Sequence, residues 1–482
     1  MLLAFIFVPL LGAALMPILR KIWKQGATIV IGLITSFLLV NSIALIHEQV
    51  TAHWSGRLIQ VWREGHLALR IDGLSLVALV SISLVALVAA FFSFRYPWNP
   101  DRRPGCYALM LLTITGMNGL VMATDLFSLY VFLEILSVSA FILIASRLDE
   151  LGVEGSFKYM MLSAVATTIL LVGIALLFAM TGNVTFTALK KAGALSNSLG
   201  FQLALAAITF AFVLKAGVMP FHGWLPDAYT AAPAPVSILL AGIVTKIAGV
   251  YTLMRVIIEV FGFTKSFTSL VLFLGSVSMI LGAFFALGQK DFKRMLAFSS
   301  ISQIGYIMAG FAVGTPLGLL GAMFHFFNHA VFKSLLFVNA GAVEQATGTR
   351  NFDKLGGLAK RMPVTGVTSV IGLLSAAGIP PLGGFWSKLV IIIALWQAGF
   401  PVYAMLAVFA SVITLAYLLT LQREVFFGKV KEGLEGIKEV TPSFYWPAIL
   451  LAAIAIVTGL FYPVFFNHLI LPAQKVLELI VK

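Results

Sequence analysis

Long runs of apolar residues alternate with short polar stretches along the whole chain of 482 residues. A run of about 18 or more apolar residues can cross the roughly 30 Å hydrocarbon core of a bilayer as a helix. Runs bounded by charged residues, glycine and proline predict fourteen transmembrane helices in a single all-α polytopic membrane domain over 1–482. The predicted spans are 2–19, 27–46, 73–94, 105–123, 125–146, 157–180, 200–219, 234–256, 266–287, 293–313, 316–339, 364–396, 401–421 and 445–468.

The composition agrees with a membrane protein and excludes a soluble enzyme. Hydrophobic residues make up 60% of the chain and charged residues 11%, with a mean hydropathy of +1.02, whereas soluble domains carry roughly 25% charged residues. In a soluble protein, the formal net charge of +13 would suggest nucleic-acid binding. Here the basic residues, Arg255 and Lys293 among them, are assigned to short loops, so topology explains them better and no nucleic-acid partner is expected.

The positions of these basic residues predict the orientation of the chain. Most of the Lys and Arg residues in loops follow odd-numbered spans, and the positive-inside rule places that side in the cytoplasm. Both termini are then expected on the outer face of the cell membrane. The first apolar run lacks the preceding basic stretch of a cleaved signal peptide, so it is interpreted as a true span.

Two segments outside the membrane are long enough to be ordered. Residues 47–72 carry apolar residues among polar neighbours, which predicts a short hairpin on the outer face. Residues 428–441 are charged and contain several glycines, which predicts a cytoplasmic connector. The predicted parts of the membrane domain are an N-terminal part with three helices (1–104), two five-helix stretches (105–258 and 264–421) and a last part with the connector and the final helix (422–482).

Five charged residues fall inside the predicted spans, away from the boundary residues of each span. They are Glu134, Lys215, Lys246, Lys333 and Lys388. A charge at the centre of a membrane helix costs about 2.5–3.5 kcal/mol on insertion scales, so these residues indicate a functional role. A structural role is the alternative for each: a lysine near a helix end can extend to the headgroups, as Lys333 would, and a glutamate can pair with a neighbouring helix.

Proline and glycine interrupt two of the spans that carry these lysines. Pro220 follows Lys215, and Pro380 and Pro381 precede Lys388. Proline removes a backbone donor and clashes with the preceding turn, so both helices are predicted to break at membrane depth. In secondary transporters, paired broken helices in two inverted repeats mark the ion path. Here each broken helix is the fourth of its five-helix stretch.

The eleventh span carries three titratable residues on one face. His325, His329 and Lys333 are spaced four residues apart, and imidazole can relay protons near neutral pH. A structural hydrogen-bonding role for each histidine stays open. Haem ligation is disfavoured because the other candidate ligands, His222 and His468, lie at or beyond span ends.

The single cysteine limits the redox chemistry of the chain. Cys106 has no second cysteine with which to form a disulfide, and no thiolate cluster is available for zinc or iron-sulfur ligation. No metal or cofactor is therefore expected in this chain, and any redox cofactor is expected in a partner subunit.

Several segments resemble the antiporter-like subunit family shared by respiratory complex I, Mrp-type cation/proton antiporters and membrane-bound hydrogenases with their relatives. These segments are Phe132 to Glu134, Leu214 to Ala228, Ala232 to Ser237, Thr245 to Tyr251, His325 to Lys333 and Gly378 to Lys388. They occur in this order along nearly the whole chain. The resemblance implies a fourteen-helix fold with two inverted five-helix repeats and broken seventh and twelfth helices.

The resemblance also implies a role for each buried charge. Glu134 and Lys215 would be the coupled acid–base pair, and Lys246 would connect them to the relay of the eleventh span. Lys388 would face the exit half-channel, at a position where some complex I members have glutamate. When the pair opens, the buried lysine would pass its proton to Lys246, and ion movement would follow. The chain would lack the long lateral helix of the largest family members.

Within this family, the segments 224–228 and 421–428 look more like the membrane-bound hydrogenase and complex I side than the D-type Mrp subunit. The expected function is proton or sodium translocation in a multisubunit redox complex of a prokaryotic cell membrane. Other antiporter-like and small membrane subunits and peripheral redox subunits are the expected partners, and iron-sulfur clusters, with or without nickel-iron, are expected in them. The alternative is an Mrp-type sodium/proton antiporter subunit without a redox arm.

Two functions from other classes are the remaining rivals. A solute transporter would be expected to show aromatic and polar residues converging on a cavity, where this sequence shows a row of lysines and histidines. A purely structural anchor for a redox arm would not need that row, given the cost of buried charge.

Overall fold

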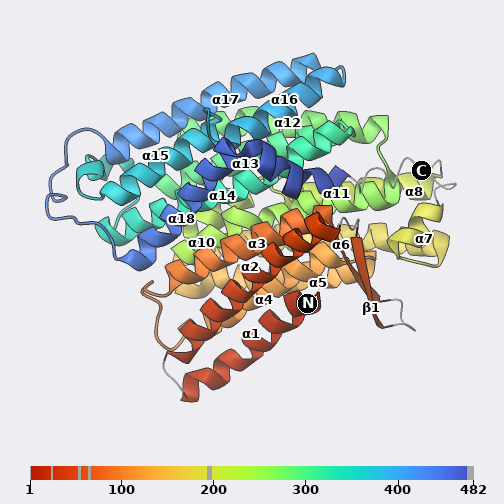
Figure 1. Ribbon diagram of the computed structural model, residues 1–482, viewed down its shortest axis with the longest axis horizontal. Helices are drawn as coiled ribbons and strands as arrows, with labels where there is room; N and C mark the ends of the chain where they lie inside the picture. Colours follow the sequence, from red (N-terminus) through yellow and green to blue (C-terminus); the bar gives the residue numbers. More distant parts are fainter. Residues whose placement is uncertain (1, 23–24, 53–55, 63–66, 193–197, 475–482) are drawn as a thin grey trace.

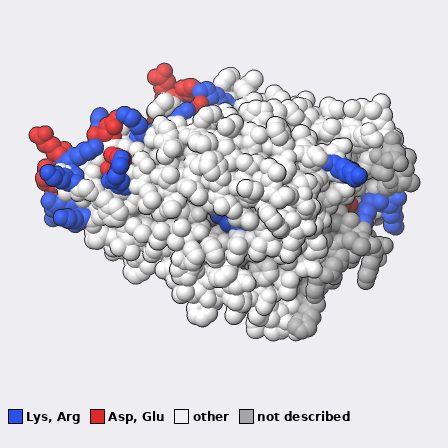
Figure 2. Space-filling view, turned by 90° about the horizontal axis from the view of Figure 1, so that it is seen from above, with Lys and Arg blue, Asp and Glu red and all other residues white. Residues whose placement is uncertain are grey.

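The computed structural model describes residues 2–22, 25–52, 56–62, 67–192 and 198–474. The parts of the predicted segments 47–72 and 422–482 that fall in the gaps lie outside the described residues. The helices run along the long axis of the molecule (Figure 1). Charged side chains gather at the two ends, and a wide neutral band separates them (Figure 2). We call the end with the β-strands the hairpin end and the end with residues 429–440 the connector end.

The helices of the first part of the chain are α1 (Ala4–Ile22), α2 (Gly26–Ala52), α3 (Gly73–Ser93), α4 (Arg103–Met122), α5 (Leu126–Ile144), α6 (Glu150–Thr181), α7 (Phe186–Lys191), α8 (Leu199–Lys215) and α9 (Trp224–Ala231). Next come α10 (Ala234–Leu239), the π-helical segments η3 (Leu240–Val244) and η4 (Lys246–Tyr251), α11 (Thr252–Val256) and the π-helical η5 (Ile257–Phe261). The remaining long helices are α12 (Lys265–Leu287), α13 (Phe292–Ala312), α14 (Pro316–Thr347), α15 (Pro363–Ala377), α16 (Gly383–Gln397), α17 (Pro401–Leu421) with η8 (Gln422–Phe426), and α18 (Pro442–Leu460).

The polar residue before each apolar run explains where many of these helices begin. Asp125, for example, accepts a hydrogen bond from Ser128 N at 2.7 Å and caps α5, which satisfies a backbone donor that the helix itself leaves free. Within the described residues, ten helices are long and apolar enough to cross a membrane, and further apolar helices are shorter. The prediction of an all-helical polytopic membrane protein is confirmed.

Both predicted breaks are present. The seventh predicted span, 200–219, contains α8 and the break, and the second helical piece, α9, begins only at Trp224; the twelfth predicted span contains both α15 and α16. A glycine with positive φ follows each first half, Gly217 at +66° and Gly378 at +82°. A left-handed backbone conformation is open to glycine at little cost, so the chain leaves the helix at these points.

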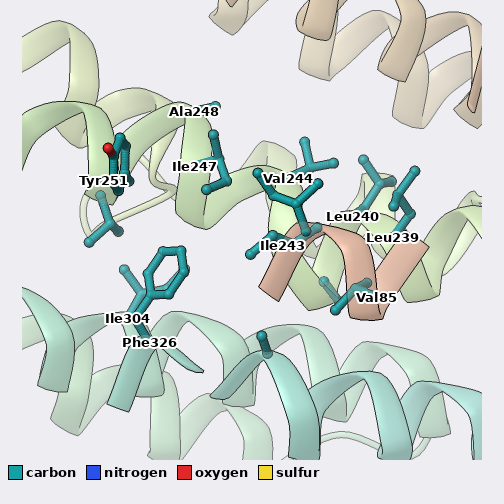
Figure 3. Packing of buried hydrophobic residues seen from close by; sticks show 14 of the residues in the cluster. Val85, Leu239, Leu240, Ile243, Val244, Ile247, Ala248, Tyr251, Ile304 and Phe326 are labelled. Atoms are coloured by element: carbon teal, nitrogen blue, oxygen red, sulfur yellow. The ribbon is translucent and has the colours of Figure 1, made fainter. Parts of the chain in front are cut away.

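The eighth predicted span is one continuous and fully buried helical rod, from α10 to η5. Its π-helical segments are wider than an α-helix. Such segments are rare in proteins, and those that occur are often found at functional sites. Apolar side chains of the rod, such as Ile243 and Ile247, face Val85 of α3 and Ile304 and Phe326 of the neighbouring helices (Figure 3). The rod therefore lies at the centre of the bundle, shielded from lipid.

The predicted hairpin is confirmed in part. Strands β1 (Gly56–Trp62) and β2 (Leu67–Asp72) pair antiparallel, with Gly56 opposite Asp72. Residues 47–52, however, continue helix α2. This extension is mostly polar, and its buried residue is Gln49, which protein packing accommodates past the predicted end of the second span.

Two of the cations assigned to loops lie inside the bundle. Arg255 belongs to α11 and Lys293 to α13, and both are buried. Their assignment to loops is wrong because each has an acidic partner distant in sequence, Asp72 at 2.6 Å and Glu344 at 2.8 Å. A buried cation is retained where such a partner offsets its lost hydration.

Candidate functional site

Lys215 ends helix α8 just before the break and is buried. Its Nζ donates to Ser137 Oγ of α5 at 2.7 Å and to Ser163 Oγ of α6 at 2.5 Å. Glu134 lies one turn before Ser137, is half-buried, and forms no ion pair with Lys215 among the described contacts; its buried Oε1 has no hydrogen-bond partner. The predicted acid and base are therefore neighbours without direct contact.

Lys246 is fully buried in the π-helical rod. Its Nζ donates to the carbonyl of Ala241 at 2.7 Å and to that of Gly242. These carbonyls belong to the lysine's own helix, and within the described residues no other element neutralises its charge. A Cβ at Gly242 would overlap Ser334 Oγ of α14, which shows how closely the rod approaches that helix.

Lys333 lies in the middle of α14, which extends to Thr347 rather than ending at the predicted Asn339. It is fully buried and donates to Ser299 Oγ of α13 at 2.8 Å and to the Leu296 carbonyl at 3.1 Å. Ser299 in turn bonds with Tyr417 Oη of α17 at 2.6 Å. This position rules out the alternative in which Lys333 extends to the headgroups.

The two histidines of α14 lie on the same face of the helix as Lys333. Their rings are 6.2 Å apart between centroids and nearly parallel. His325 bonds with Ser387 Oγ of α16 at 2.9 Å and with Gln303 Oε1 of α13 at 3.2 Å. Neither ring nitrogen of the buried His329 has a hydrogen-bond partner in the described part of the chain.

Lys388 follows the second break, one turn into α16. Its Nζ donates to the Ala376 carbonyl at 2.8 Å and to Ser411 Oγ of α17 at 3.1 Å. It also lies 4.6 Å from the ring centroid of Tyr306, whose ring centroid is 5.6 Å from that of His325. The Tyr306 ring thus joins the last lysine to the histidines.

The structure brings together the predicted residues of the second half of the chain. Lys333, His329, His325 and Lys388 follow one another on α14 and α16, connected by the hydroxyl and ring contacts above. Lys246 and Lys215 lie on the first half, on the rod and on α8. We call these six residues the buried cation row. No carboxylate forms an ion pair with any of them in the described ranges.

The sequence analysis missed the polar side chains that bind this row. Five hydroxyl residues and one amide contact its members directly: Ser137, Ser163, Ser299, Ser387, Ser411 and Gln303. Serine in an apolar helix commonly bonds its own backbone, and so a single sequence gives little sign of such a contact. The one available signal for such a contact is that these residues lie on helix faces that also carry small residues.

Three polar pairs lie along helix α15, two of them between buried side chains. The pairs are Thr365 with Glu439 at 2.7 Å, Thr368 with Asn339 at 3.1 Å and Ser369 with Gln422 at 3.2 Å. The amide nitrogens of Asn339 and Gln422 are buried without a hydrogen-bond partner among the described residues. Buried polar groups of this kind are commonly satisfied by ordered water. Helix α15 supplies one hydroxyl to each pair.

Ion pairs close both ends of the bundle. At the hairpin end, Arg255 bonds both carboxylate oxygens of Asp72, at 2.6 and 2.9 Å, and Tyr251 Oη at 2.5 Å. Burial raises the pKa of Asp72, but the charge and hydrogen bonds of Arg255, the charge of Arg70 and the Ser75 N–H together outweigh burial and hold this pKa well below its usual range. At the connector end, Glu344 pairs with the buried Lys293 at 2.8 Å.

Side chains that ligate metals do not cluster in the described ranges. No group of three or more His, Cys, Asp or Glu among these residues is arranged to hold a metal ion. Cys106 is buried in α4. What the described arrangement can do chemically is move protons or bind cations among lysine, histidine and hydroxyl groups.

Comparisons with known proteins show which proteins this chain is similar to. The D-type subunit of a Na(+)/H(+) antiporter from Alkalihalophilus pseudofirmus is 30% identical over 409 residues, which cover 84% of this chain and 83% of that protein. The N-type subunit of an NADH-quinone oxidoreductase from Desulforudis audaxviator is 33% identical over 412 residues, with 82% of each chain covered. A chain of the Mrp complex from Dietzia sp. superposes with a TM-score of 0.90 at 27% identity, covering 99% of this chain and 97% of that one.

One family matches most of the chain. It is described as NADH:quinone oxidoreductase/Mrp antiporter, transmembrane, and its match covers residues 123–414. That range contains the whole buried cation row, Glu134 and both helix breaks. The chain therefore belongs to this family of antiporter-like membrane subunits.

Proposed function

We propose that this chain translocates protons or sodium ions as an antiporter-like subunit of a multisubunit membrane complex. The observation that carries the proposal is the buried cation row, in which four lysines and two histidines lie inside an apolar bundle without acidic partners among the described residues. Several unpaired charges at this depth are too costly for a scaffold, and such residues mark ion paths in membrane proteins. The solute-transporter and structural-anchor alternatives do not account for them.

The two broken helices support an inverted-repeat arrangement with residues 105–258 as the first repeat and 264–421 as the second. Each repeat has its break in the fourth helix, and a lysine next to it, Lys215 or Lys388. Freed backbone groups at such breaks bind ions or water, as in transporters built from repeats. On this basis we count fourteen spans, with α8 and α9 as one and α15 and α16 as another.

The pathway we propose runs along the buried cation row. Lys215 alternates between the serine contacts and a charge pair with Glu134, and its release delivers a proton to Lys246. The proton then passes over Lys333 and the histidines to Lys388, which faces the exit side. Each transfer is driven by electrostatics, because an ammonium group in an apolar bundle repels the next cation at short range.

The proposal also concerns the kind of complex that drives ion translocation through this chain. We propose a redox complex of the membrane-bound hydrogenase or complex I type, with iron-sulfur clusters, and nickel-iron where a hydrogenase is present, in other subunits. The match to a quinone oxidoreductase subunit supports it. The second candidate is an Mrp-type sodium/proton antiporter without a redox arm, which the matches to the D-type antiporter subunit and the Mrp complex support.

We further propose that the connector end faces the cytoplasm of a prokaryotic cell and that both termini lie outside. The excess of basic residues in loops at that end supports this orientation. The polar pairs on α15 would then give the row access to water on the cytoplasmic side.

The proposal is tested by neutralising the predicted pair in the intact complex. Lys215→Ala and Glu134→Ala are each expected to abolish ion transport into inverted membrane vesicles, measured with pH-sensitive and sodium-sensitive dyes, while the complex still assembles on native gels. Arg423→Ala, at an exposed residue of the connector end, is the control and should transport normally. Unimpaired transport in both test variants would refute the proposal.

The two candidate complexes are separated by metal analysis of the complex purified through this chain in mild detergent. Stoichiometric iron, with or without nickel, would identify a redox-driven pump. A metal-free assembly of hydrophobic subunits that exchanges sodium for protons would identify an Mrp-type antiporter.

A further inference from the structure

A cavity of about 470 Å³ opens at the connector end, between the start of α2 and the loop that joins α3 to α4. Its lining includes Gln25, Thr28, Phe94, Arg95 and Arg103. The arginines of this cavity come from the α3–α4 loop and the first turn of α4. Helix α2 contributes its lipid-facing surface. The cavity is more than 90 residues before Lys215 in sequence and is independent of the buried cation row.

The two arginines of this cavity lack counter-charges. Neither Arg95 nor Arg103 forms an ion pair with any residue that the structure describes, and the only acid of the loop, Asp101, is not part of the lining. The Nε of Arg103 is buried without a hydrogen-bond partner. A buried donor on a charged group is costly to leave unsatisfied, and a planar guanidinium is best satisfied by the paired oxygens of a phosphate or carboxylate.

Other arginines at the same end are satisfied within the chain. Arg147 bonds Tyr96 Oη, and Arg350 bonds Asp291 at 3.2 Å and the Thr230 carbonyl at 2.7 Å. Exposed arginines at this end, such as Arg361, also lack an ion pair among the described residues, but Arg103 is the one described arginine with a buried guanidinium nitrogen that has no partner. The first turn of α4 adds to the positive character of the cavity, because its N-cap residue Arg102 makes no side-chain capping bond and the helix dipole favours an anion there.

An apolar track leads from the cavity toward the centre of the neutral band. Ile29, Leu33 and Phe37 follow one another on the exposed face of α2, with exposed fractions of 40%, 64% and 45%. A phosphate on the arginines and acyl chains along this track would belong to one amphiphilic molecule. A free phosphate ion would use only the first half of this surface.

We propose that this cavity binds the phosphate of an anionic phospholipid, with an acyl chain lying along Ile29, Leu33 and Phe37 of α2. Basic pockets between transmembrane helices at the membrane surface are suited to anionic headgroups. The bound lipid connects the start of α2 to the α3–α4 loop, at a place where the described side chains alone leave two positive charges unpaired.

Native mass spectrometry of the complex in mild detergent tests this proposal. Purified complex is delipidated and then incubated with phosphatidylglycerol, with phosphatidylcholine or with inorganic phosphate. One retained phosphatidylglycerol per copy of this chain is expected, with at least about tenfold weaker retention in the Arg95→Gln/Arg103→Gln variant. Arg361→Gln, which removes an exposed charge from the same end, should retain the lipid like the unmodified protein.

Four results would overturn the proposal. Equal retention of phosphatidylglycerol by the double variant would remove the arginines from the site, and equal retention of phosphatidylcholine would remove the need for an anion. Inorganic phosphate that displaces the lipid adduct would assign the site to a free ion. A photoreactive label attached to Thr28→Cys tests whether a partner subunit fills the cavity instead of a lipid. Crosslinks to phospholipid support the proposal, and crosslinks to a partner subunit refute it. Thermal unfolding of each variant confirms that it is folded.

Discussion

Lys215 donates a hydrogen bond to Ser137 one turn of helix α5 away from Glu134, the acid with which the sequence predicts it to pair. Ser163 of α6 accepts a second bond from the same ammonium group. The two serines hold the lysine beside the acid but out of contact with it. In the mechanism that we propose, this arrangement corresponds to the open state of the pair, with the serines as the alternative position of the lysine.

Removing this alternative position should keep the pair closed. In Ser137→Ala/Ser163→Ala, Lys215 loses two hydrogen bonds to a charged group, each worth about 1.5–3 kcal/mol, and should settle on Glu134. Ion transport in inverted vesicles is expected to fall by about tenfold or more, with normal assembly. Ser139→Ala is the matched control, because Ser139 lies on the same helix and bonds Thr113 instead. Full transport by the double variant would show that the serines do not position the lysine.

The contact between Gly249 and Ala216 sets the distance between α8 and the π-helical rod. A Cβ at Gly249 would overlap the backbone of Ala216, the residue after Lys215. Gly249→Ala should therefore separate the two elements and destabilise the protein by about 1–3 kcal/mol, as overpacking does. A lower Tm and reduced transport are expected together. Gly223→Ala, in the same break but with no atom within 4 Å of its Cβ position, should leave both unchanged.

Asp72 and Arg255 tie the hairpin to the buried rod. Asp72→Asn leaves Arg255 buried with a weakened partner, and breaking a buried pair costs about 3–5 kcal/mol. A large drop in Tm at neutral pH is expected in detergent, with Glu432→Gln, at an exposed acid of the connector end, as the control. An unchanged Tm would show that Glu259, 3.3 Å from Arg255, is a sufficient partner.

The Asp72–Arg255 pair also predicts how the difference in Tm between the unmodified protein and Asp72→Asn depends on pH. Burial raises the pKa of Asp72, yet Arg255, Arg70 and the Ser75 N–H together bring it below the ordinary value of 3.8. A lowered pKa in the folded state gives stability that is fully present above 3.8 and is lost as the pH falls below it. The Tm difference between the unmodified protein and Asp72→Asn should thus be constant from about pH 8 to 5 and shrink only below about pH 4. A difference that shrinks between pH 7 and 5 would contradict this account.

Much of the fold could be predicted from the sequence because membrane insertion leaves a direct trace in the chain. Apolar runs locate the helices, and Pro220 and Pro380 locate the breaks, since proline cannot continue a helix. The ends of helices were less predictable. Residues 47–52 extend α2, and α14 continues to Thr347, because packing inside the protein permits polar residues that lipid would not.

The residues of the candidate site also differ in how far the sequence alone could predict them. A lysine in an apolar run is conspicuous, so Lys215, Lys246 and Lys388 could be found from the sequence alone. Lys293 and Arg255 lie near the ends of their runs, and only the fold shows that each is buried against an acid distant in sequence. The serines that contact the row could not be distinguished from serines that bond their own helix.

The contact between Lys388 and Tyr306 allows a further test. Either the aromatic ring of Tyr306 holds the lysine at the end of the buried cation row, or the Tyr306 hydroxyl is the group that matters. The lysine Nζ lies 4.6 Å from the ring centroid, while the Tyr306 hydroxyl donates to the Ala407 carbonyl at 2.5 Å. A buried cation over an aromatic face gains about 2 kcal/mol or more. If the ring holds the lysine, Tyr306→Phe should keep most of the transport activity and Tyr306→Leu should lose about 90% or more of it. If the hydroxyl matters instead, both variants should fail alike, and Ser411, which also bonds Lys388, would be the group that organises the exit.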